Sequence, residues 1–203
     1  MAIETIEELE TLYDARISDA ARLKETDRII APYARLIEAS PFAILATSGP
    51  EGLDCSPRGD RPGFLKVQDD RTLVLPDRKG NNRLDSLRNI LNDPRVALLF
   101  LIPGSSTTLR VNGRAVISDD PVLLESLAID DKLPKTALVI SVETVYFQCA
   151  RAVLRAGLWD SDSQVDPKSL PSAGDILEAA SDARINGESF DRDWAERAVK
   201  TLW

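Results

Sequence analysis

Two short polar segments of this chain carry residue types that bind phosphate. The first is Ser56-Pro57-Arg58-Gly59-Asp60, and the second runs from Asp77 to Arg83 with the sequence DRKGNNR. A phosphate group needs backbone N–H groups, the positive end of a helix and one or two cations. Glycine lets the backbone approach the ligand, asparagines donate hydrogen bonds, and arginine grips phosphate with two donors. The candidate ligands of the second segment are Arg78, Lys79, Gly80, Asn81, Asn82 and Arg83.

Each segment also has an ordinary structural interpretation. The second can be a charged loop that caps a helix, because short basic glycine loops are common without a ligand. The first can be a surface turn in which Arg58 pairs with Asp60. In a phosphate site, Ser56 and Gly59 would accompany Arg58, which would point at the phosphate or at the polar edge of a ligand ring. Asp60 would orient Arg58 or accept a hydrogen bond from the ligand.

The elements around the second segment are those that a phosphate site requires. The apolar run Thr72 to Leu75 predicts a strand immediately before it. Leu84, Leu87 and Leu91 recur at spacings of three and four residues, which predicts an amphipathic helix over 81–91. We expect Asn81 or Asn82 to cap this helix and Asp93-Pro94 to end it.

Short β-rich runs dominate the middle of the chain, and tight turns separate several of them. Tight turns indicate antiparallel pairing. Asn112-Gly113 is either a hairpin turn or a bulge in one bent strand, and we favour the bulge because a curled sheet needs such a bend. We therefore expect a mainly β protein with flanking helices (α+β), in which six antiparallel strands close into a split barrel. The runs are 42–47, 53–56, 64–67, 72–75, 95–102, 107–118 and 136–148.

The organisation of the chain predicts a central domain between two helical ends. Helices are expected at 4–14 and 26–38, the latter capped by Thr26 or Asp27, and a further one begins at 119–121. A Ser/Asp/Pro linker at 161–172 precedes two more helices, at about 173–183 and 189–202. The predicted units are a helical arm at 1–40, a barrel domain at 41–159, and a linker with helices at 160–203 that pack on the barrel or on a partner.

Charge and hydropathy exclude several classes of protein. The 203 residues carry a net charge of −8, and the excess acid lies in residues 1–40 and 160–203. No face can collect the excess of Lys and Arg that nucleic acid requires, so no nucleic-acid partner is expected. No apolar run reaches the roughly 20 residues of a membrane span, and the acidic N-terminus does not resemble a secretory signal. We expect a cytoplasmic protein without a membrane partner.

The chain has no histidine and two cysteines, Cys55 and Cys149. Mechanisms of the Ser-His-Asp or Cys-His type are therefore excluded. Two cysteines at this spacing match no metal or redox motif, so no metal site is expected. Both are interpreted as free thiols with a small apolar role, although Cys149 lies where a reactive thiol remains an alternative.

Residues 41–159 resemble the pyridoxamine 5′-phosphate oxidase-like, flavin-binding split-barrel superfamily. The pattern also resembles a bacterial branch known mainly as uncharacterised flavin-binding members. The match covers over half of the chain, with its segments in the expected order. The segments that carry the resemblance are PFAILAT, CSPRGDRPGF, LVLPDRKGNNRLDSLRNILNDPRVALLFLIPG and TLRVNGRAVI.

The resemblance implies flavin mononucleotide (FMN) as the cofactor and a homodimer with two flavins in its interface. Arg58 and the residues of the second segment would surround the phosphate and the ribityl chain. Val74, Leu75 and Pro76 would lie along the isoalloxazine ring. The partner would contribute from the strand at 110–114 and from the segment 151–159. The residues implied there are Arg110, Arg151 and Trp159, the last of which is equally a core or interface aromatic.

One departure from the family limits what the resemblance implies. True pyridoxamine phosphate oxidases hold the vitamin with a C-terminal signature that includes a histidine, which this chain lacks. We therefore expect an FMN-dependent oxidoreductase with an unknown small-molecule substrate or electron donor and no identified catalytic residue. The alternatives are a flavin-binding redox sensor, carrier or stress protein, or the same barrel holding a deazaflavin or haem. Haem is disfavoured because its usual histidine ligand is missing.

Overall fold

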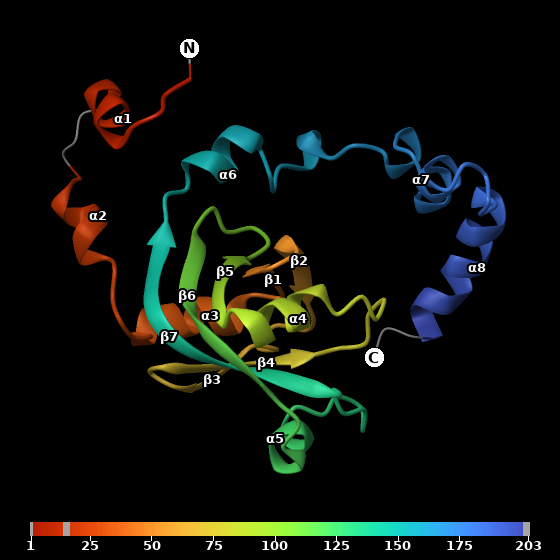
Figure 1. Ribbon diagram of the computed structural model, residues 1–203, viewed down its shortest axis with the longest axis horizontal. Helices are drawn as coiled ribbons and strands as arrows, with labels where there is room; N and C mark the ends of the chain where they lie inside the picture. The colour runs from red at the N-terminus through yellow and green to blue at the C-terminus, as the bar shows by residue number, and fades with distance from the viewer. Residues whose placement is uncertain (1, 14–16, 201–203) are drawn as a thin grey trace.

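Seven antiparallel strands form one sheet in the order β2-β1-β5-β6-β7-β4-β3 (Figure 1). The computed structural model describes residues 2–13 and 17–200. The strands are β1 (Phe42–Gly49), β2 (Gly52–Gly59), β3 (Lys66–Asp69), β4 (Thr72–Asp77), β5 (Arg95–Leu101), β6 (Thr108–Ser118) and β7 (Thr136–Gln148). The helices beside the sheet are α3 (Ala31–Ala39), α4 (Asp85–Asn92), α5 (Pro121–Ser126) and α6 (Arg151–Ala156).

The prediction of six strands in a closed barrel was wrong in both respects. The sheet has seven strands, because each of the seven β-rich runs contributes a strand to it. It is not closed, since the two strands that end the order, β2 and β3, are not paired with each other. Two helices pack beside the sheet: α4 contacts β1, β2 and β6, and α3 contacts β3, β6 and β7.

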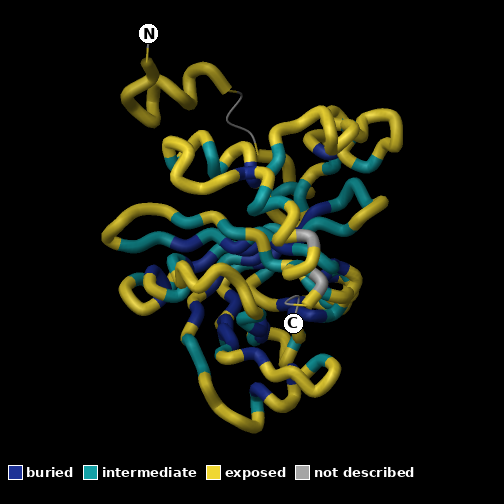
Figure 2. The backbone as a smooth tube through the Cα atoms, turned by 90° about the vertical axis from the view of Figure 1, so that its right-hand side faces the viewer, coloured by how far each residue is buried: buried dark blue, intermediate teal, exposed yellow. Residues whose placement is uncertain are grey.

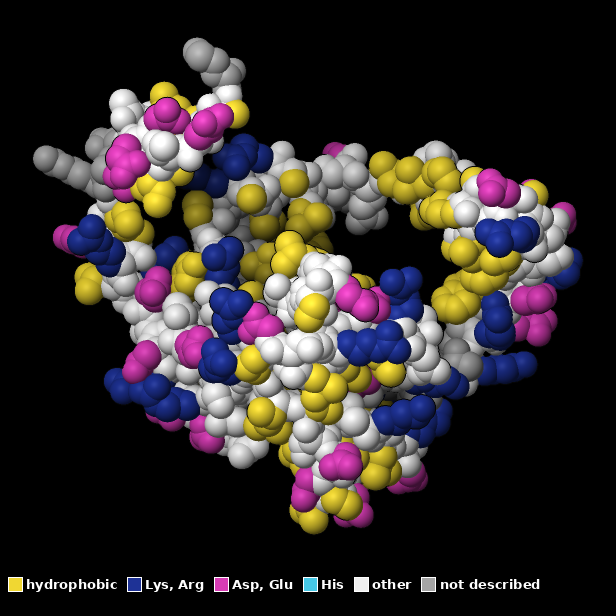
Figure 3. Space-filling view, viewed as in Figure 1, with side chains coloured by type: hydrophobic (Ala, Val, Ile, Leu, Met, Phe, Trp, Pro, Cys, Tyr) yellow, Lys and Arg dark blue, Asp and Glu magenta, His cyan; other side chains and the backbone are white. Residues whose placement is uncertain are grey.

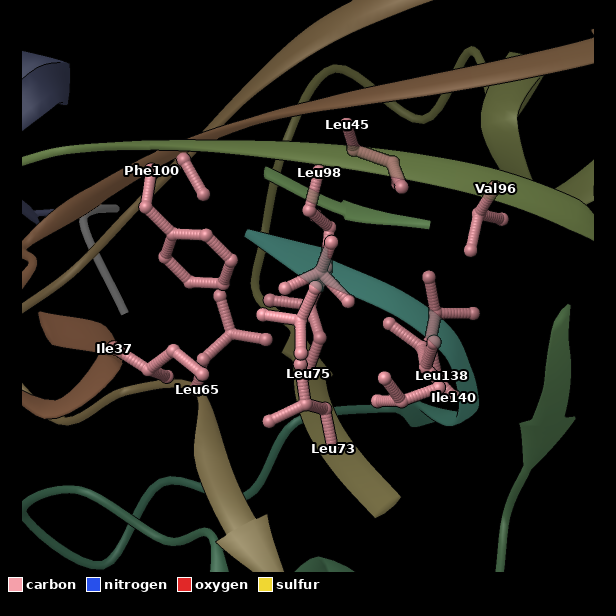
Figure 4. Packing of buried hydrophobic residues seen from close by; sticks show 14 of the residues in the cluster. Ile37, Leu45, Leu65, Leu73, Leu75, Val96, Leu98, Phe100, Leu138 and Ile140 are labelled. Carbon is pink, nitrogen blue, oxygen red and sulfur yellow. The ribbon is translucent and has the colours of Figure 1, made fainter. Parts of the chain in front are cut away.

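The core fills the inside of this curled sheet (Figure 4). Alternate residues of β1 and β5 are buried, as the period of two in a strand requires. Phe100 and Leu45 are fully buried and point toward side chains from β4 and β7. Burying a side chain of this size stabilises a fold by about 1.5–3 kcal/mol. Figure 2 shows the buried residues concentrated in the sheet and the exposed ones in the arms and loops.

The pair Asn112-Gly113 lies within the continuous strand β6, which confirms the bulge rather than the hairpin turn. The register between β6 and β7 shifts between these two residues. A Cβ atom on Gly113 would lie 2.2 Å from the carbonyl oxygen of Ser141 on β7. Only glycine therefore fits this position, and the long β6–β7 ribbon bends there.

Two predicted helix starts were wrong. Helix α3 begins at Ala31, because Thr26 forms a β-bridge in which its backbone exchanges hydrogen bonds of 3.0 and 2.8 Å with Val145. Helix α4 begins at Asp85 after Leu84, whose φ of 63° is left-handed. Neither Asn81 nor Asn82 caps the helix, because Leu84 occupies the N-cap position and no side chain forms a cap hydrogen bond. The helix therefore begins four residues later than predicted. The left-handed residues Asn82 and Leu84 form a turn that the leucine spacing did not indicate.

The chain ends form arms that extend away from the sheet (Figure 1). Helices α1 (Ile6–Leu12) and α2 (Asp19–Leu23) precede α3, whose Tyr33 and Ile37 belong to the sheet's core. After α6, the linker contains two short 3-10 helices, η1 (Ser161–Ser163) and η2 (Pro167–Ser169), and leads to α7 (Ala173–Ala180) and α8 (Gly187–Lys200). None of the helices in the described ranges is long and apolar enough to cross a membrane.

Candidate functional site

The two polar segments meet in one pocket of about 940 Å³, a volume within the range of small-molecule sites. Its walls come from β2, from the end of β4 and the loop after it, from the start of α4, and from the loop before β7. The lining residues that the sequence had singled out are Ser56, Arg58, Arg78, Lys79, Gly80, Asn81, Asn82 and Arg83. The basic side chains around the loop between β4 and α4 are visible in Figure 3.

A hydrogen-bonded cluster organises the β2 wall of the pocket. Ser86, in the first turn of α4, is 4% exposed and lies 2.5 Å from Oδ2 of Asp54 and 2.9 Å from Oγ of Ser56. A guanidinium N–H of Arg58 donates to Oγ of Ser86 at 2.9 Å. Sequence reasoning missed Asp54 and Ser86. The alternation of β2 was the available signal, because Asp54 shares a face with Ser56 and Arg58.

Arg58 and Asp77 form a partly buried ion pair in the pocket. Their closest atoms are 3.8 Å apart, and their side chains are 24% and 20% exposed. Burial raises the pKa of Asp77 above its ordinary value, an effect that the charges of Arg58 and Lys135 partly offset. Desolvation therefore destabilises the ionised carboxylate more than the charges of Arg58 and Lys135 stabilise it. A bound anion would compete with Asp77 for Arg58.

Arg78 lines the pocket, but its guanidinium also holds the fold together. Its Nε donates to Oδ2 of Asp60 at 2.9 Å, and a terminal nitrogen donates to the backbone oxygen of Leu127 at 2.9 Å. The side chain of Asp60 is fully buried and that of Arg78 is 16% exposed. This pair ties the end of β2 to the segment after α5. Asp60 thus pairs with Arg78 and not with Arg58.

The rim of the pocket is basic. Lys79 and Arg83 are exposed, and Arg83 pairs with Asp85 at 2.7 Å. Gly80 has open space where a side chain would be. Lys132 and Lys135, from the loop before β7, complete the rim. The pairing of β7 with β4 brings this segment to the pocket.

Thr136, at the start of β7, gives the pocket wall a buried polar atom without a partner. Its Oγ1 is the one buried side-chain oxygen or nitrogen in the described part of the chain that forms no hydrogen bond. Such atoms cost free energy unless a ligand or water forms a hydrogen bond with them.

The donor set of the whole pocket fits a phosphate ester on chemical grounds, since it combines a guanidinium, serine hydroxyls, exposed cations and a glycine-containing loop.

The remaining residues implied for the cofactor do not line this pocket: Gly59, Asp60, Val74, Pro76, Arg110, Arg151 and Trp159. Val74 is 2% exposed and packs against Leu124 and Leu127, behind the pocket wall. Arg110 donates to the hydroxyl of Tyr146 at 2.9 Å, and the indole of Trp159 donates to the backbone oxygen of Ser105 at 2.7 Å.

Three of these residues, Arg110, Arg151 and Trp159, lie at the other end of the β6–β7 ribbon. Arg110 is opposite Tyr146 on β7, whereas the pocket lies at Thr136, where β7 begins. Ten strand residues separate these positions by roughly 30 Å. Within one chain the structure therefore assembles the residues of the two polar segments and leaves Arg110, Arg151 and Trp159 apart from them.

Cys55 and Cys149 are both exposed and free, and neither lines the pocket. The described residues contain no cluster of three or more acidic or cysteine side chains that could hold a metal ion.

An open antiparallel sheet with a basic pocket between its margins defines a split-barrel-like protein. Residues 30–149, more than half of the chain, match the family model of pyridoxamine 5′-phosphate oxidase, and the chain belongs to this family. No protein of curated function matches the chain.

Parts of the chain are similar to several solved structures at low identity. The HupZ protein of Group A Streptococcus is 19% identical and aligns with a TM-score of 0.48, over 59% of this chain and 93% of its own. General Stress Protein 26 of Bacillus anthracis is 17% identical, with a TM-score of 0.42 over 56% and 88%. A FAD-binding protein of Mesorhizobium loti is 14% identical, with a TM-score of 0.42 over 62% and 99%.

The raised pKa of Asp77 predicts a pH-dependent stability difference. A raised folded-state pKa means that stability is full below the unfolded value of 3.8 and falls as pH rises through the folded value. We expect Asp77→Asn to match the parent chain in acid and to exceed it increasingly as the pH rises toward neutrality. Urea midpoints of both proteins across pH 3 to 7 measure this. A parent chain that is the more stable one at neutral pH would show that the Arg58 ion pair outweighs burial.

Proposed function

We propose that this chain binds FMN in the pocket between β2, β4, α4 and β7 and works as an FMN-dependent oxidoreductase. The observation that carries the proposal is the meeting of the two polar segments around Arg58 and Ser86, beside the buried, unpartnered hydroxyl of Thr136. Membership of the pyridoxamine 5′-phosphate oxidase family supports a flavin as the ligand.

The residues of the pocket would hold the phosphate in different ways. Arg58 would turn from Asp77 and Ser86 to the phosphate oxygens, while Ser56 and Ser86 offer hydroxyl donors. Lys79 and Arg83 would neutralise charge from the rim, and the backbone at Gly80, with Asn81 and Asn82, would supply further donors. Arg78 and Asp60 would keep the end of β2 in place.

When bound, FMN supplies the hydride or electron transfer, and the protein supplies position, electrostatics and exclusion of water. A chain without histidine suits this division because no protein acid or base is strictly required. The phosphate end would be fixed in the pocket of one copy. A second copy would contribute Arg110, Arg151 and Trp159 to the remaining part of the flavin, so that the cofactor lies in a homodimer interface.

The substrate is proposed to be a small molecule other than pyridoxamine phosphate, because the chain has no histidine to match that family's vitamin-binding signature. A flavin-binding sensor, carrier or stress protein would use the same pocket without turnover. Oxidation of a nicotinamide donor by the FMN-loaded protein would favour the enzyme. Tight flavin binding without turnover would favour a sensor, carrier or stress protein.

Addition of FMN to the purified protein tests the proposal. Bound FMN should change the flavin absorption spectrum and raise the melting temperature, since ligand at 100 times Kd stabilises by about 2.7 kcal/mol. Riboflavin, which lacks the phosphate, is the matched control and should bind more weakly. A colourless protein that leaves the FMN spectrum and its own melting temperature unchanged would contradict the assignment. The spectrum of any chromophore that copurifies distinguishes FMN from a deazaflavin or haem.

A further inference from the structure

Helices α7 and α8 form a hairpin that is fixed internally. The backbone N–H of Gly174 donates to Oδ1 of Asp191 at 2.8 Å, and that of Gly187 donates to Oε2 of Glu178 at 2.6 Å. The helices cross at these glycines, because a Cβ on Gly174 would lie 2.2 Å from the backbone oxygen of Gly187. The hairpin is therefore a defined structural unit and not an irregular tail.

The apolar side chains of this hairpin remain exposed. Ile176 on α7 is 59% exposed and Trp194 on α8 is 51% exposed, although Trp194 stacks on Phe190. The segment that leads to the hairpin is similar, with Val165 at 61% and Leu170 at 55%. Two short helices bury too little apolar surface to be stable in water without another surface. The hairpin thus lacks the surface that would cover it.

Open space separates the hairpin from the sheet of its own chain. Figure 3 shows this gap, with hydrophobic side chains along the hairpin's side of it. On the opposite side of the molecule, α1 also stands away from the sheet and exposes apolar side chains, with Ile6 at 70% and Leu12 at 67%. Both arms therefore extend around a volume that their own chain does not fill.

The charges of the hairpin and of the pocket are opposite. Residues 173–200 carry seven acidic and four basic side chains, and the lining of the pocket carries six basic and three acidic ones. The acidic residues of the hairpin are Asp175, Glu178, Asp182, Glu188, Asp191, Asp193 and Glu196. Every copy of the chain carries both surfaces. In a two-fold dimer, the acidic hairpin of each copy can therefore contact the basic pocket rim of the other.

We propose that a second copy of this chain fills the gap, and that each α7–α8 hairpin covers the basic rim of the other copy's pocket. The apolar side chains around Ile176 and Trp194 would be buried against the second copy, with the acidic side chains facing Lys79, Lys132 and Lys135. The hairpin lies outside the segment 30–149 that matches the family model, so membership of the family does not imply this contact. As a lid over the flavin, it rests on the proposed function.

Isotope-mixed cross-linking of the flavin-free protein tests the proposal. Unlabelled and ¹⁵N-labelled chains are mixed in urea, refolded together and treated with an amine cross-linker. Lys168 and Lys200 of the arm are expected to link to Lys79, Lys132 or Lys135 in pairs that combine one labelled and one unlabelled peptide. If these lysines link only within one isotope, the hairpin covers its own barrel and the proposal is overturned. A monomeric mass of 22.3 kDa in light scattering would overturn it as well.

A surface variant gives the quantitative arm of the test. Ile176→Asp/Trp194→Asp should weaken self-association at least tenfold, as expected for loss of a central apolar contact. Val122→Asp, which alters a residue that is 75% exposed on α5, should leave self-association unchanged. Unchanged association of the double variant would contradict the proposed contact.

Because both readouts use flavin-free protein, they separate this contact from the proposed function. Mixed-isotope links in a protein that never binds FMN would refute the cofactor alone. FMN binding with links only within one isotope would refute the contact alone.

Discussion

The Arg58→Ala/Lys79→Ala double variant is expected to bind FMN about a hundredfold more weakly than the parent chain. Arg58 is a partly buried donor in the centre of the pocket, and Lys79 is an exposed cation on its rim. A hydrogen bond to a charged group contributes about 1.5–3 kcal/mol, and an exposed cation contributes less. Together they account for about 3 kcal/mol, which corresponds to a hundredfold change in Kd. Titration by flavin fluorescence measures it.

A control variant for this experiment removes the same net charge elsewhere. Arg71 and Arg95 form surface ion pairs with Asp27 and Asp93, and neither lines the pocket. Arg71→Ala/Arg95→Ala should therefore keep the FMN affinity of the parent chain. If both double variants weaken binding equally, the effect is one of overall charge. If neither does, the phosphate lies outside the pocket.

Replacing Arg78 should damage the fold more than any other single change in the pocket. Arg78→Met leaves the fully buried carboxylate of Asp60 without its guanidinium partner. Removing one member of a buried ion pair typically costs 3–5 kcal/mol. We expect a loss of about 3 kcal/mol in the free energy of unfolding, measured by urea denaturation of the flavin-free protein.

Arg83→Met is the matched control, because Arg83 pairs with Asp85 on the same rim but is 73% exposed. An exposed pair contributes about 0–1 kcal/mol, so this variant should keep nearly all of the parent's stability. A stable Arg78→Met protein that has lost FMN affinity would instead identify Arg78 as a direct phosphate ligand. The two variants therefore distinguish a structural arginine from a binding one.

Much of the fold could be predicted from local patterns in the sequence. Alternating and continuous apolar runs predicted the strands, and β7 has the predicted bounds of 136–148. Asn112-Gly113 predicted the bulge because the flanking residues continue the strand pattern on both sides. Closure was mispredicted because it depends on whether β2 and β3, which are distant in the order of the sheet, pair with each other. The capping of α4 was mispredicted because Asn82 and Leu84 adopt left-handed backbone that their types do not require.

The site was predictable where its residues are close in sequence and not where pairing brings them together. The basic segment 77–83 was visible directly, since its charges and glycine are contiguous. Lys132, Lys135 and Thr136 reach the pocket only through the pairing of β7 with β4. Each arginine pairs with an aspartate of the other segment: Arg78 with Asp60, and Arg58 with Asp77. This pairing depends on which side chains are buried together. No spacing rule in the sequence specifies it.

The open sheet gives the pocket a mechanical consequence. In the order of the sheet, β2 is at one margin, while β4 lies next to the strand at the other. The pocket takes residues from both, with Asp54, Ser56 and Arg58 on one side and Asp77 on the other. A ligand held here joins the two margins that no backbone hydrogen bond joins. The molecule that fills this pocket would complete the barrel that the polypeptide leaves open.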